Sequence, residues 1–358
     1  MASPFRNTLD GLRSFDHGLS VDEARRISGR HDVLNLAGNE NTVGASPRVA
    51  EAVRAGAESA WIYPDSACRE LTVAIARHLD VAPGRILCGT GSEALLGLIT
   101  RATLDPSDRV ILSSPTFPIY ASLAVAAGAT VIDVARRPDH RLDIDALARA
   151  MSQPAKLIFL CNPNNPTGTP IPSDDIARIA ALVGSGGLVV VDEAYHEFHQ
   201  IEYPRRTFEA LDAAGSPWIV LRTFSKAYAL GGFRVGYAVA SEEAVVEVLD
   251  RIRPQFGVSS LGQRAALAAL DDQAHLLRAV QEICSARAKL QEGLEELGFR
   301  VDASAANFLF VEAPSAMPEH LATQGIIVRP LGAGRLRLTV CRERDVPRVV
   351  AAFRSAQD

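Results

Sequence analysis

The chain has few of the features that mark membrane, secreted or metal-binding proteins. It contains no apolar run near the ~20 residues that a helix needs to cross a bilayer, and its first twenty residues have no apolar signal core. The five cysteines form no CxxC pair, and the histidines form no HExxH motif, since YHEFH at 195–199 has the wrong spacing. We therefore expect a cytoplasmic protein with reduced thiols and no bound metal.

An excess of basic residues is also missing. The 358 residues include 37 Lys and Arg against 42 Asp and Glu, which gives a net charge of −5. This balance offers no polybasic face, so we expect neither nucleic acid nor a membrane as a partner. The hydrophobic content of 47% is enough for one large core and one smaller core, which favours two domains.

From about residue 70 the chain alternates between helical and strand patterns. Seven short apolar segments have the composition of buried strands: 84–91, 108–115, 130–135, 155–168, 186–195, 217–226 and 234–241. Apolar strands that alternate with helices predict an α/β fold with a mostly parallel seven-stranded sheet, covered by helices on both faces. In such sheets the ligand lies beyond the carboxyl ends of the strands.

The pattern changes near residue 245. Longer helical stretches follow, then mixed strand and helix patterns up to the C-terminus, which indicates a smaller α+β domain. We predict an N-terminal arm or small-domain part at 1–35, a large ligand-binding domain at 36–245 and a small C-terminal domain at 246–358.

One lysine has unusual neighbours. Lys226 lies within RTFSKAYALGG, and no acid stands among the surrounding residues 224–230. Such surroundings desolvate the amine in part and favour its neutral form. Because a neutral amine can attack a carbonyl carbon and form a Schiff base, Lys226 is a candidate nucleophile.

A glycine-rich turn at 89–97, GTGSEALLG, follows a predicted strand and opens a predicted helix. Gly91 and Ser92 would present backbone N–H groups and a helix N-terminus to an anion. A plain tight turn or a dinucleotide site would also fit, although the next strand ends without the acid that a dinucleotide site needs. Arg234 could face the same anion, or could form a surface ion pair.

Two further strand ends carry polar groups. The turn CNPNNPTG at 161–168 is stiffened by two prolines and directs a side-chain amide, for which Asn165 is the candidate. Asp192 ends the apolar run VVVD, with Tyr195 three residues later. A buried acid is costly without a positive partner, such as a protonated ring nitrogen. Alternatively, Asp192 could cap a helix.

In chain order these groups match the needs of one cofactor. A phosphate cradle, an amide, a buried carboxylate and a desolvated lysine are what pyridoxal 5'-phosphate requires. The lysine would hold its aldehyde, the carboxylate its ring proton, and the cradle its phosphate.

Over nearly its whole length the sequence resembles the fold-type-I pyridoxal-phosphate enzymes, and within them the histidinol-phosphate aminotransferase group. The resemblance is carried by NEN at 39–41, YPD at 63–65, GTGSE at 89–93, PTFPIY at 115–120, NPNNPTG at 162–168, DEAY at 192–195, SKAYALGGFRVG at 225–236 and LRLTV at 336–340. It implies a homodimer and an aminotransferase that moves an amino group to a 2-oxo acid such as 2-oxoglutarate. The implied donor is histidinol phosphate or an aromatic or specialised amino acid.

The resemblance also implies roles for individual residues. Lys226, Asp192 and Tyr195 resemble the catalytic set. The residues that resemble the cofactor-binding set are Gly91, Ser92, Glu93, Phe117, Asn165, Asp192, Tyr195, Thr223, Ser225, Lys226, Arg234 and, lent to the neighbouring subunit, Tyr63. Arg337, Arg329 and Asn39 resemble the substrate-binding residues.

Departures from the group's pattern lie on the substrate side or in the local backbone. NEN continues as Thr42-Val43-Gly instead of Pro-Tyr-Gly, Ala94 replaces a second acid, and Cys341 replaces a glycine. A decarboxylase or lyase of the threonine-phosphate decarboxylase type, which shares this fold, is therefore the alternative activity. A cofactor-binding regulatory module is a third reading, but such modules usually carry an attached DNA-binding domain.

Overall fold

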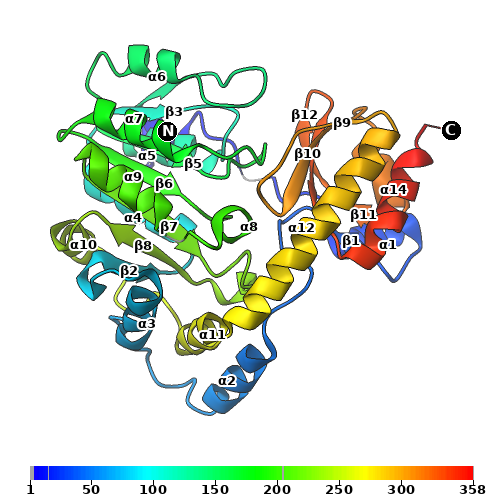
Figure 1. Ribbon diagram of the computed structural model, residues 1–358, viewed down its shortest axis with the longest axis horizontal. Helices are drawn as coiled ribbons and strands as arrows, with labels where there is room; N and C mark the ends of the chain where they lie inside the picture. Colours follow the sequence, from blue (N-terminus) through cyan, green and yellow to red (C-terminus); the bar gives the residue numbers. More distant parts are fainter. Residues whose placement is uncertain (1–3, 15, 204, 358) are drawn as a thin grey trace.

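A seven-stranded sheet forms the larger part of the structure (Figure 1). The computed structural model describes residues 4–14, 16–203 and 205–357. The strands of this sheet, in spatial order, are β2 (Ile86–Gly89), β8 (Gly236–Ala240), β7 (Trp218–Thr223), β6 (Leu188–Asp192), β5 (Leu157–Cys161), β3 (Arg109–Leu112) and β4 (Thr130–Asp133). Strand β8 runs antiparallel to the other six strands of this sheet, which all point the same way, so the predicted mostly parallel seven-stranded sheet is confirmed.

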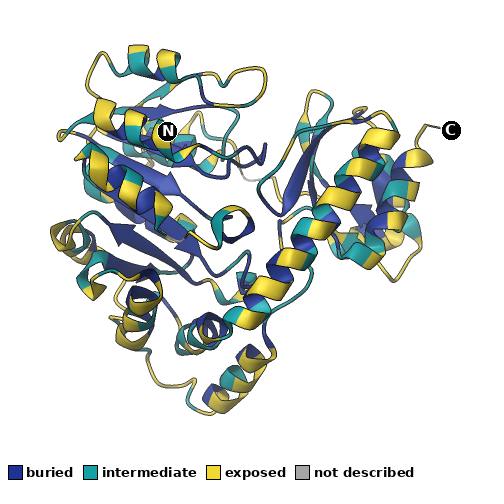
Figure 2. Ribbon diagram, viewed as in Figure 1, coloured by how far each residue is buried: buried dark blue, intermediate teal, exposed yellow. Residues whose placement is uncertain are grey.

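Helices cover both faces of this sheet, which explains its continuous apolar strands. In β6, Val189 and Val191 pack into one hydrophobic cluster while Val190 packs into the other. The first cluster includes residues of α3 (Arg69–Leu79), α6 (Ile144–Ala150), α7 (Ser173–Val183), α8 (Glu197–Gln200) and α9 (Arg206–Ala214). The second includes residues of α4 (Ser92–Thr103), α5 (Ile119–Ala127) and α10 (Glu243–Asp250). Figure 2 shows the strands buried between these layers.

The smaller part is built on a four-stranded antiparallel sheet. Its strands, in spatial order, are β12 (Arg329–Gly332), β13 (Arg335–Thr339), β10 (Phe308–Glu312) and β9 (Arg300–Val301). Three helices accompany it: α12 (Gln273–Glu296), α13 (Met317–Thr323) and α14 (Val346–Arg354). Short 3-10 turns complete the structure at Asn7–Leu9, Pro83–Arg85, Gly231–Phe233 and Glu343–Asp345.

The long helix α12 links the two parts (Figure 1). Asp272 caps it by accepting a hydrogen bond from the backbone N–H of His275 at 3.2 Å. Buried side chains recur along one face at helical spacing, as at Leu276, Ile283 and Leu290, so one stripe of the helix packs into the core.

The division into domains at 1–35, 36–245 and 246–358 remains a prediction. The helices that precede α12 favour a later boundary between the two larger domains. Helix α11 (Ser260–Asp271) packs on α2 (Pro47–Ala57) and α3, and α10 packs on α4. These contacts favour a boundary near residue 272, because both helices lie beside elements of the larger sheet.

The N-terminal segment contacts both parts. Helix α1 (Val21–Ser28) packs on α13, and β1 (Leu34–Asn35) pairs with β11 (Ile326–Ile327) in parallel. By contrast, the 3-10 turn at Asn7–Leu9 contacts α5 of the larger part.

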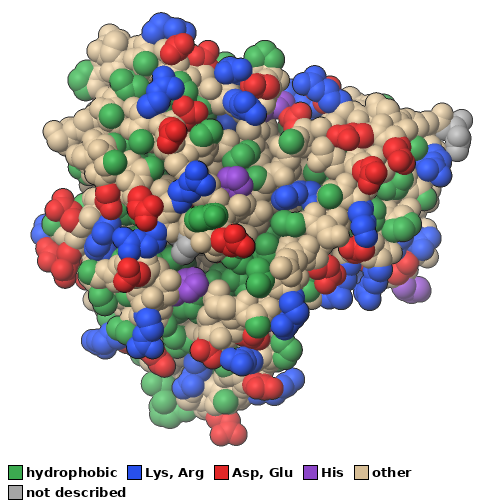
Figure 3. Space-filling model, in the orientation of Figure 1, with side chains coloured by type: hydrophobic (Ala, Val, Ile, Leu, Met, Phe, Trp, Pro, Cys, Tyr) green, Lys and Arg blue, Asp and Glu red, His purple; other side chains and the backbone are tan. Residues whose placement is uncertain are grey.

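Charges of both signs are mixed over the face of the molecule seen in Figure 3. Among the described residues, none of the helices combines the length and the hydropathy that crossing a membrane requires.

Candidate active site

A cleft with a volume of about 720 Å³ lies where the two parts meet. Its lining comes from the N-terminal segment, from the carboxyl ends of β5, β6 and β7, and from β12 and β13 of the small sheet. The predicted site residues in this lining are Asn39, Ser92, Glu93, Phe117, Asn165, Asp192, Tyr195, Thr223, Ser225, Lys226, Arg234, Arg329 and Arg337. The cleft therefore brings together residues from every predicted motif except YPD.

Lys226 lies three residues beyond the end of β7 and reaches across the cleft. Its Nζ donates a hydrogen bond to the carbonyl oxygen of Gly38 at 2.9 Å and lies 5.8 Å from the ring centre of Tyr195. Burial, followed by the positive charge of Arg337, lowers the pKa of the Lys226 amine from 10.5 to about 8. A much larger fraction of this amine is neutral at neutral pH than in a free lysine.

Asp192 ends β6 and is only 5% exposed. One carboxylate oxygen accepts a hydrogen bond from the hydroxyl of Tyr120 at 2.8 Å, and the other accepts one from the Ala194 N–H at 3.2 Å. Burial raises the pKa of Asp192 to about 6. Helix α8 begins only at Glu197, so Asp192 does not cap it.

The environment of Asp192 fits a cationic ligand. Within the described ranges, no lysine or arginine forms an ion pair with this carboxylate. A buried acid without a charged partner is costly, and a protonated ring nitrogen would supply the missing positive charge.

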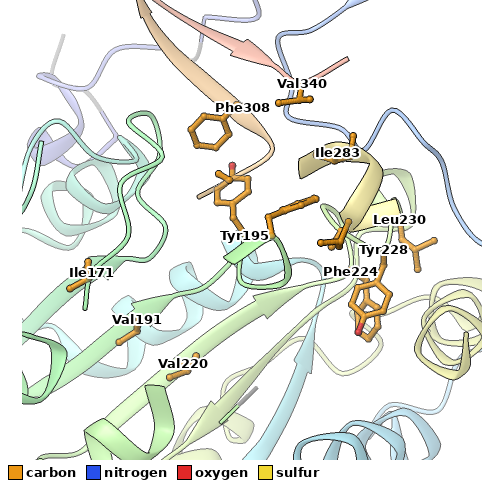
Figure 4. Packing of buried hydrophobic residues seen from close by; sticks show 14 of the residues in the cluster. Ile171, Val191, Tyr195, Val220, Phe224, Tyr228, Leu230, Ile283, Phe308 and Val340 are labelled. Carbon is orange, nitrogen blue, oxygen red and sulfur yellow. The ribbon is translucent and has the colours of Figure 1, made fainter. Parts of the chain in front are cut away.

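Three segments of the chain meet around Tyr195. The side-chain amide of Asn39 donates to the Tyr195 hydroxyl at 2.9 Å, and Arg337 donates to Asn165 Oδ1 at 2.7 Å. The Tyr195 ring also meets Phe308 of the small sheet edge to face, with ring centres 5.0 Å apart, and Figure 4 shows the two side chains pointing toward each other. The Tyr195 hydroxyl and the Asn165 amide nitrogen remain able to donate hydrogen bonds to a ligand.

The start of α4 forms an anion cradle. Gly91 at its N-cap has φ +81° and offers no capping side chain, which leaves the first N–H groups of the helix open. A Cβ atom at Gly91 would lie 2.7 Å from Nη2 of Arg234. The hydroxyl of Thr223 donates to Ser225 Oγ at 2.9 Å, and Arg234 donates to the same oxygen at 3.4 Å. These N–H groups, hydroxyls and guanidinium suit a phosphate.

The aromatic candidates are placed differently from each other. Phe117 lines the cleft and meets Tyr120 edge to face, with ring centres 5.7 Å apart. Tyr63 lies outside the cleft lining, where its side chain is 77% exposed and stacks on Phe256 at 4.6 Å. In the described single chain, Tyr63 is therefore not part of this site.

The small sheet contributes arginines to the cleft. Arg337 donates to the backbone oxygen of Ala37 at 2.6 Å as well as to Asn165, but its buried Nε has no partner among the described residues. Arg329 donates to the backbone oxygen of Asp16 at 2.7 Å and pairs with the Asp16 carboxylate at 3.6 Å. The orphaned Nε makes Arg337 the better placed of the two to bind a substrate anion.

Sequence reasoning missed the groups that support these residues. Tyr120 was visible only as the last letter of PTFPIY, inside an apolar helix, and gave no sign of its bond to Asp192. Behind the cleft, Arg222 donates to Glu193 Oε2 through Nε at 2.9 Å and Nη2 at 2.7 Å, and Thr207 also donates to Glu193. In the sequence, the available signal for the pair of Arg222 and Glu193 was their position beside Thr223 and Asp192, at the ends of two strands.

Glycine is also required at a second position. A Cβ atom at Gly236 in β8 would lie 2.6 Å from the backbone nitrogen of Ser92. This close approach brings the start of α4 against the sheet and so fixes the position of the anion cradle.

Comparisons with known proteins agree with this geometry. The model of the family "Aminotransferase class I and II" matches residues 31–353. A histidinol-phosphate aminotransferase of Caulobacter vibrioides is 42% identical over 360 residues, covering 99% of this chain and 94% of that protein. A histidinol-phosphate aminotransferase of a Geobacillus species is 35% identical, covering 97% of this chain and 96% of that protein.

Solved structures give the same family. The histidinol-phosphate aminotransferase of Sinorhizobium meliloti, crystallised in complex with pyridoxal-5'-phosphate, superposes with a TM-score of 0.87 at 29% identity, covering 99% of this chain and 98% of that one. A double mutant of Thermus thermophilus aspartate aminotransferase superposes with a TM-score of 0.83 at 25% identity, covering 99% and 100%. The predicted fold type is therefore confirmed, and the chain belongs to the aminotransferase class I and II family and is an aminotransferase.

Proposed function

We propose that this aminotransferase uses pyridoxal 5'-phosphate to move an amino group from histidinol phosphate, or from an aromatic or specialised amino acid, to a 2-oxo acid such as 2-oxoglutarate. The observation that carries the proposal is the convergence, in one cleft, of a lysine with a lowered pKa and a buried aspartate that forms no ion pair with a lysine or arginine of the described chain. The names of the relatives from Caulobacter vibrioides and Sinorhizobium meliloti support histidinol phosphate as the donor.

The donor set of the cleft fits this cofactor. The cradle at Gly91 and Ser92, with Thr223, Ser225 and Arg234, would hold the phosphate. When bound, pyridoxal 5'-phosphate supplies an aldehyde that bonds to amines and a protonated ring that accepts electrons released at the donor carbon.

The catalytic residues act on protons at the two ends of the ring. The Lys226 amine would bond to the aldehyde, and once free it would take the proton from the donor carbon, which its lowered pKa favours. The Asp192 carboxylate would hold the proton on the ring nitrogen, and its pKa would fall below 6 as that charge arrives.

Hydrogen bonds would orient the ring between these residues. The Tyr195 hydroxyl accepts from Asn39, so its own proton is available to the phenolic oxygen of the cofactor. Asn165 accepts from Arg337 at Oδ1, which leaves its amide nitrogen to donate to the same oxygen. Glu93 borders the ring site, and Phe117 offers a flat apolar face to one side of the ring. Arg337, with Arg329, would bind the anion of the substrate.

The experiment that tests the proposal measures amino transfer directly. The holoenzyme is incubated with histidinol phosphate and 2-oxoglutarate, and glutamate formation is measured. Threonine phosphate serves as a parallel substrate, with release of CO2 as the readout of a decarboxylase. Glutamate formed by the wild type but not by a Lys226→Ala variant supports transamination, whereas CO2 without glutamate would support the alternative reading.

A homodimer in the cytoplasm completes the proposal. Exposed apolar side chains cluster in sequence beside the predicted shared residue, with Trp61 84%, Ile62 50% and Tyr63 77% exposed. Phe256, which stacks on Tyr63, is 46% exposed. Such a patch is typical of an interface, and a second copy of the chain would cover it while Tyr63 reaches the phosphate of the neighbouring site. Sedimentation at several concentrations, with Tyr63→Phe and Trp61→Glu variants, tests this assembly.

A further inference from the structure

A third arginine of the small sheet, Arg335, lines the cleft with Arg337 and Arg329. In β13 the residues alternate, with Leu336 and Leu338 buried in the small-domain core while Arg335 and Arg337 are half-buried. Because successive side chains of a strand point to opposite faces, Arg335 and Arg337 share the face that lines the cleft. In the sequence, the alternation of arginine and leucine in RLRLT indicates that the two arginines share a face.

Along this face Arg335 lies farther from the catalytic residues than Arg337. Thr339, at the inner end of β13, donates to the Asn39 side chain at 3.2 Å, and Asn39 in turn contacts Tyr195. Each two-residue step along a strand covers ~6.8 Å. Arg337 therefore occupies the middle of the strand face and Arg335 its outer end.

The arginines along this face differ in how many hydrogen bonds and ion pairs they already form within the protein. Arg337 donates to two oxygens, those of Asn165 and Ala37, and Arg329 is paired with Asp16. No ion pair or side-chain hydrogen bond involves Arg335 in the described part of the chain.

The acid opposite Arg335 in the small sheet is already paired. Glu312 stands opposite Arg335 in the sheet register, but its carboxylate pairs with Arg300 at 3.4 Å. Of these three arginines, Arg335 is thus the one whose guanidinium can direct all of its hydrogen bonds to a ligand.

The cleft as a whole favours a substrate with more than one negative charge. Its lining contains five cations, Lys226, Arg234, Arg329, Arg335 and Arg337, against the three acids Glu40, Glu93 and Asp192. Under the proposed function, Asp192 serves the ring nitrogen and Arg234 the cofactor phosphate. The remaining arginines form a row from the middle of the small-sheet face to its outer end.

The length of the anion decides which of these arginines it reaches. A carboxylate bonded directly to the reacting carbon is short and suits the inner arginine, Arg337. A phosphate monoester on a methylene group extends farther and carries two charges near neutral pH. Its outer oxygens would meet the next guanidinium along the strand, which is that of Arg335.

We infer that Arg335 is a specificity-determining residue that binds the outer oxygens of a phosphate monoester on the donor, whereas Arg337 binds the anions of both donor and acceptor. This inference rests on the proposed function and narrows its donor to the phosphorylated class. It assigns the choice between phosphate and carboxylate to one position of β13.

The test compares two small anions that bind without reacting. Binding of glycerol 3-phosphate and of propionate to the holoenzyme is measured by titration calorimetry for the wild type, Arg335→Gln, Arg335→Lys and Arg337→Gln. Arg335→Gln should raise the Kd of glycerol 3-phosphate about tenfold, equivalent to ~1.4 kcal/mol, and the Kd of propionate less than about twofold. Arg337→Gln should weaken both, and Arg335→Lys should lie between the wild type and Arg335→Gln.

Arg354 in the last turn of α14 provides the matched control, because it is an exposed arginine of the small domain outside the cleft lining. Arg354→Gln should change neither Kd. The inference would be overturned if Arg335→Gln weakened the binding of both anions equally or of neither. It would also be overturned if the wild type did not bind glycerol 3-phosphate. If the wild type binds it but transfers no amino group from histidinol phosphate, the proposed donor fails while the calorimetry still decides the role of Arg335.

Discussion

The two sides of the cleft are built in different ways. On the large-sheet side, Asp192 and Thr223 end adjacent parallel strands, and Lys226 follows three residues later, so backbone pairing within one region of the chain sets their spacing. On the small-sheet side, Arg337 and Arg329 are held by the partners Ala37 and Asp16, which lie about 300 residues away in the sequence. The first side is therefore encoded locally, while the second depends on how the chain ends meet.

Replacing Lys226 should have the largest effect, on the locally encoded side. Lys226→Ala removes the amine that bonds to the aldehyde and carries the proton, so kcat/KM should fall at least ~10³-fold. The variant should also lack the cofactor adduct that borohydride fixes on the wild-type lysine, as measured by mass spectrometry. A reduced adduct at another lysine with full activity would remove Lys226 from the mechanism.

Asp192 should rank second. Asp192→Asn keeps the shape but cannot hold a ring proton, so kcat should fall by about 10²–10³-fold while the anions of both substrates still bind. Asp139, an exposed acid on the loop between β4 and α6, provides the matched control, and Asp139→Asn should keep wild-type kcat. Near-normal turnover of Asp192→Asn would count against the assigned role.

Although Asp192→Asn should lower kcat, it should raise the stability of the cofactor-free protein. The folded-state pKa of Asp192 is raised to about 6 from 3.8, so folding favours the protonated acid and stability falls as pH rises from about 4 through 6. Two pKa units correspond to at most about 3 kcal/mol. Cofactor-free Asp192→Asn should therefore melt at a higher temperature than the wild type at pH 8, with little difference at pH 4. Melting curves with and without cofactor test this reversal.

The sequence predicted the large-sheet side of the cleft in more detail than the small-sheet side, and the reason is physical. Runs such as VVVD predict a buried strand and the acid at its end, because both belong to one local pattern. Neither the bond from Tyr120 to Asp192 nor that from Asn39 to Tyr195 has a local signal, since each joins residues at least 72 positions apart. Tyr63 was named from the resemblance alone, and its role depends on a second chain.

Arg337 tests the side built from distant contacts. Arg337→Gln removes a forked donor for the substrate anion and loosens Asn165, so KM for both donor and acceptor should rise about 10–100-fold. Affinity for the cofactor should change much less, because the phosphate cradle lies on the other side. Arg337→Lys keeps the charge without the fork and should recover only part of the loss. A cofactor affinity that falls as much as substrate affinity would show that the two sides are not separable.

The smallest effect is expected where the two sides touch each other. His140, on the loop between β4 and α6, hydrogen-bonds through Nδ1 to the Asp302 carboxylate beyond β9, and its ring meets Phe310 of β10 edge to face at 5.0 Å. Phe310 also lines the cleft. This contact ties the small sheet to the large one at the rim of the site.

Breaking the contact should loosen the closure of the cleft without touching the cofactor. His140→Gln and Asp302→Asn should each raise KM for both substrates about two- to fivefold, and the double variant should add little, because the pair acts as one unit. Arg137→Gln breaks the exposed pair of Arg137 with Asp139 on the same loop and should leave KM unchanged. Steady-state kinetics of the three single variants and the double variant decide the matter: additive effects, or an equal effect of Arg137→Gln, would mean that the His140–Asp302 contact does not couple the two sides.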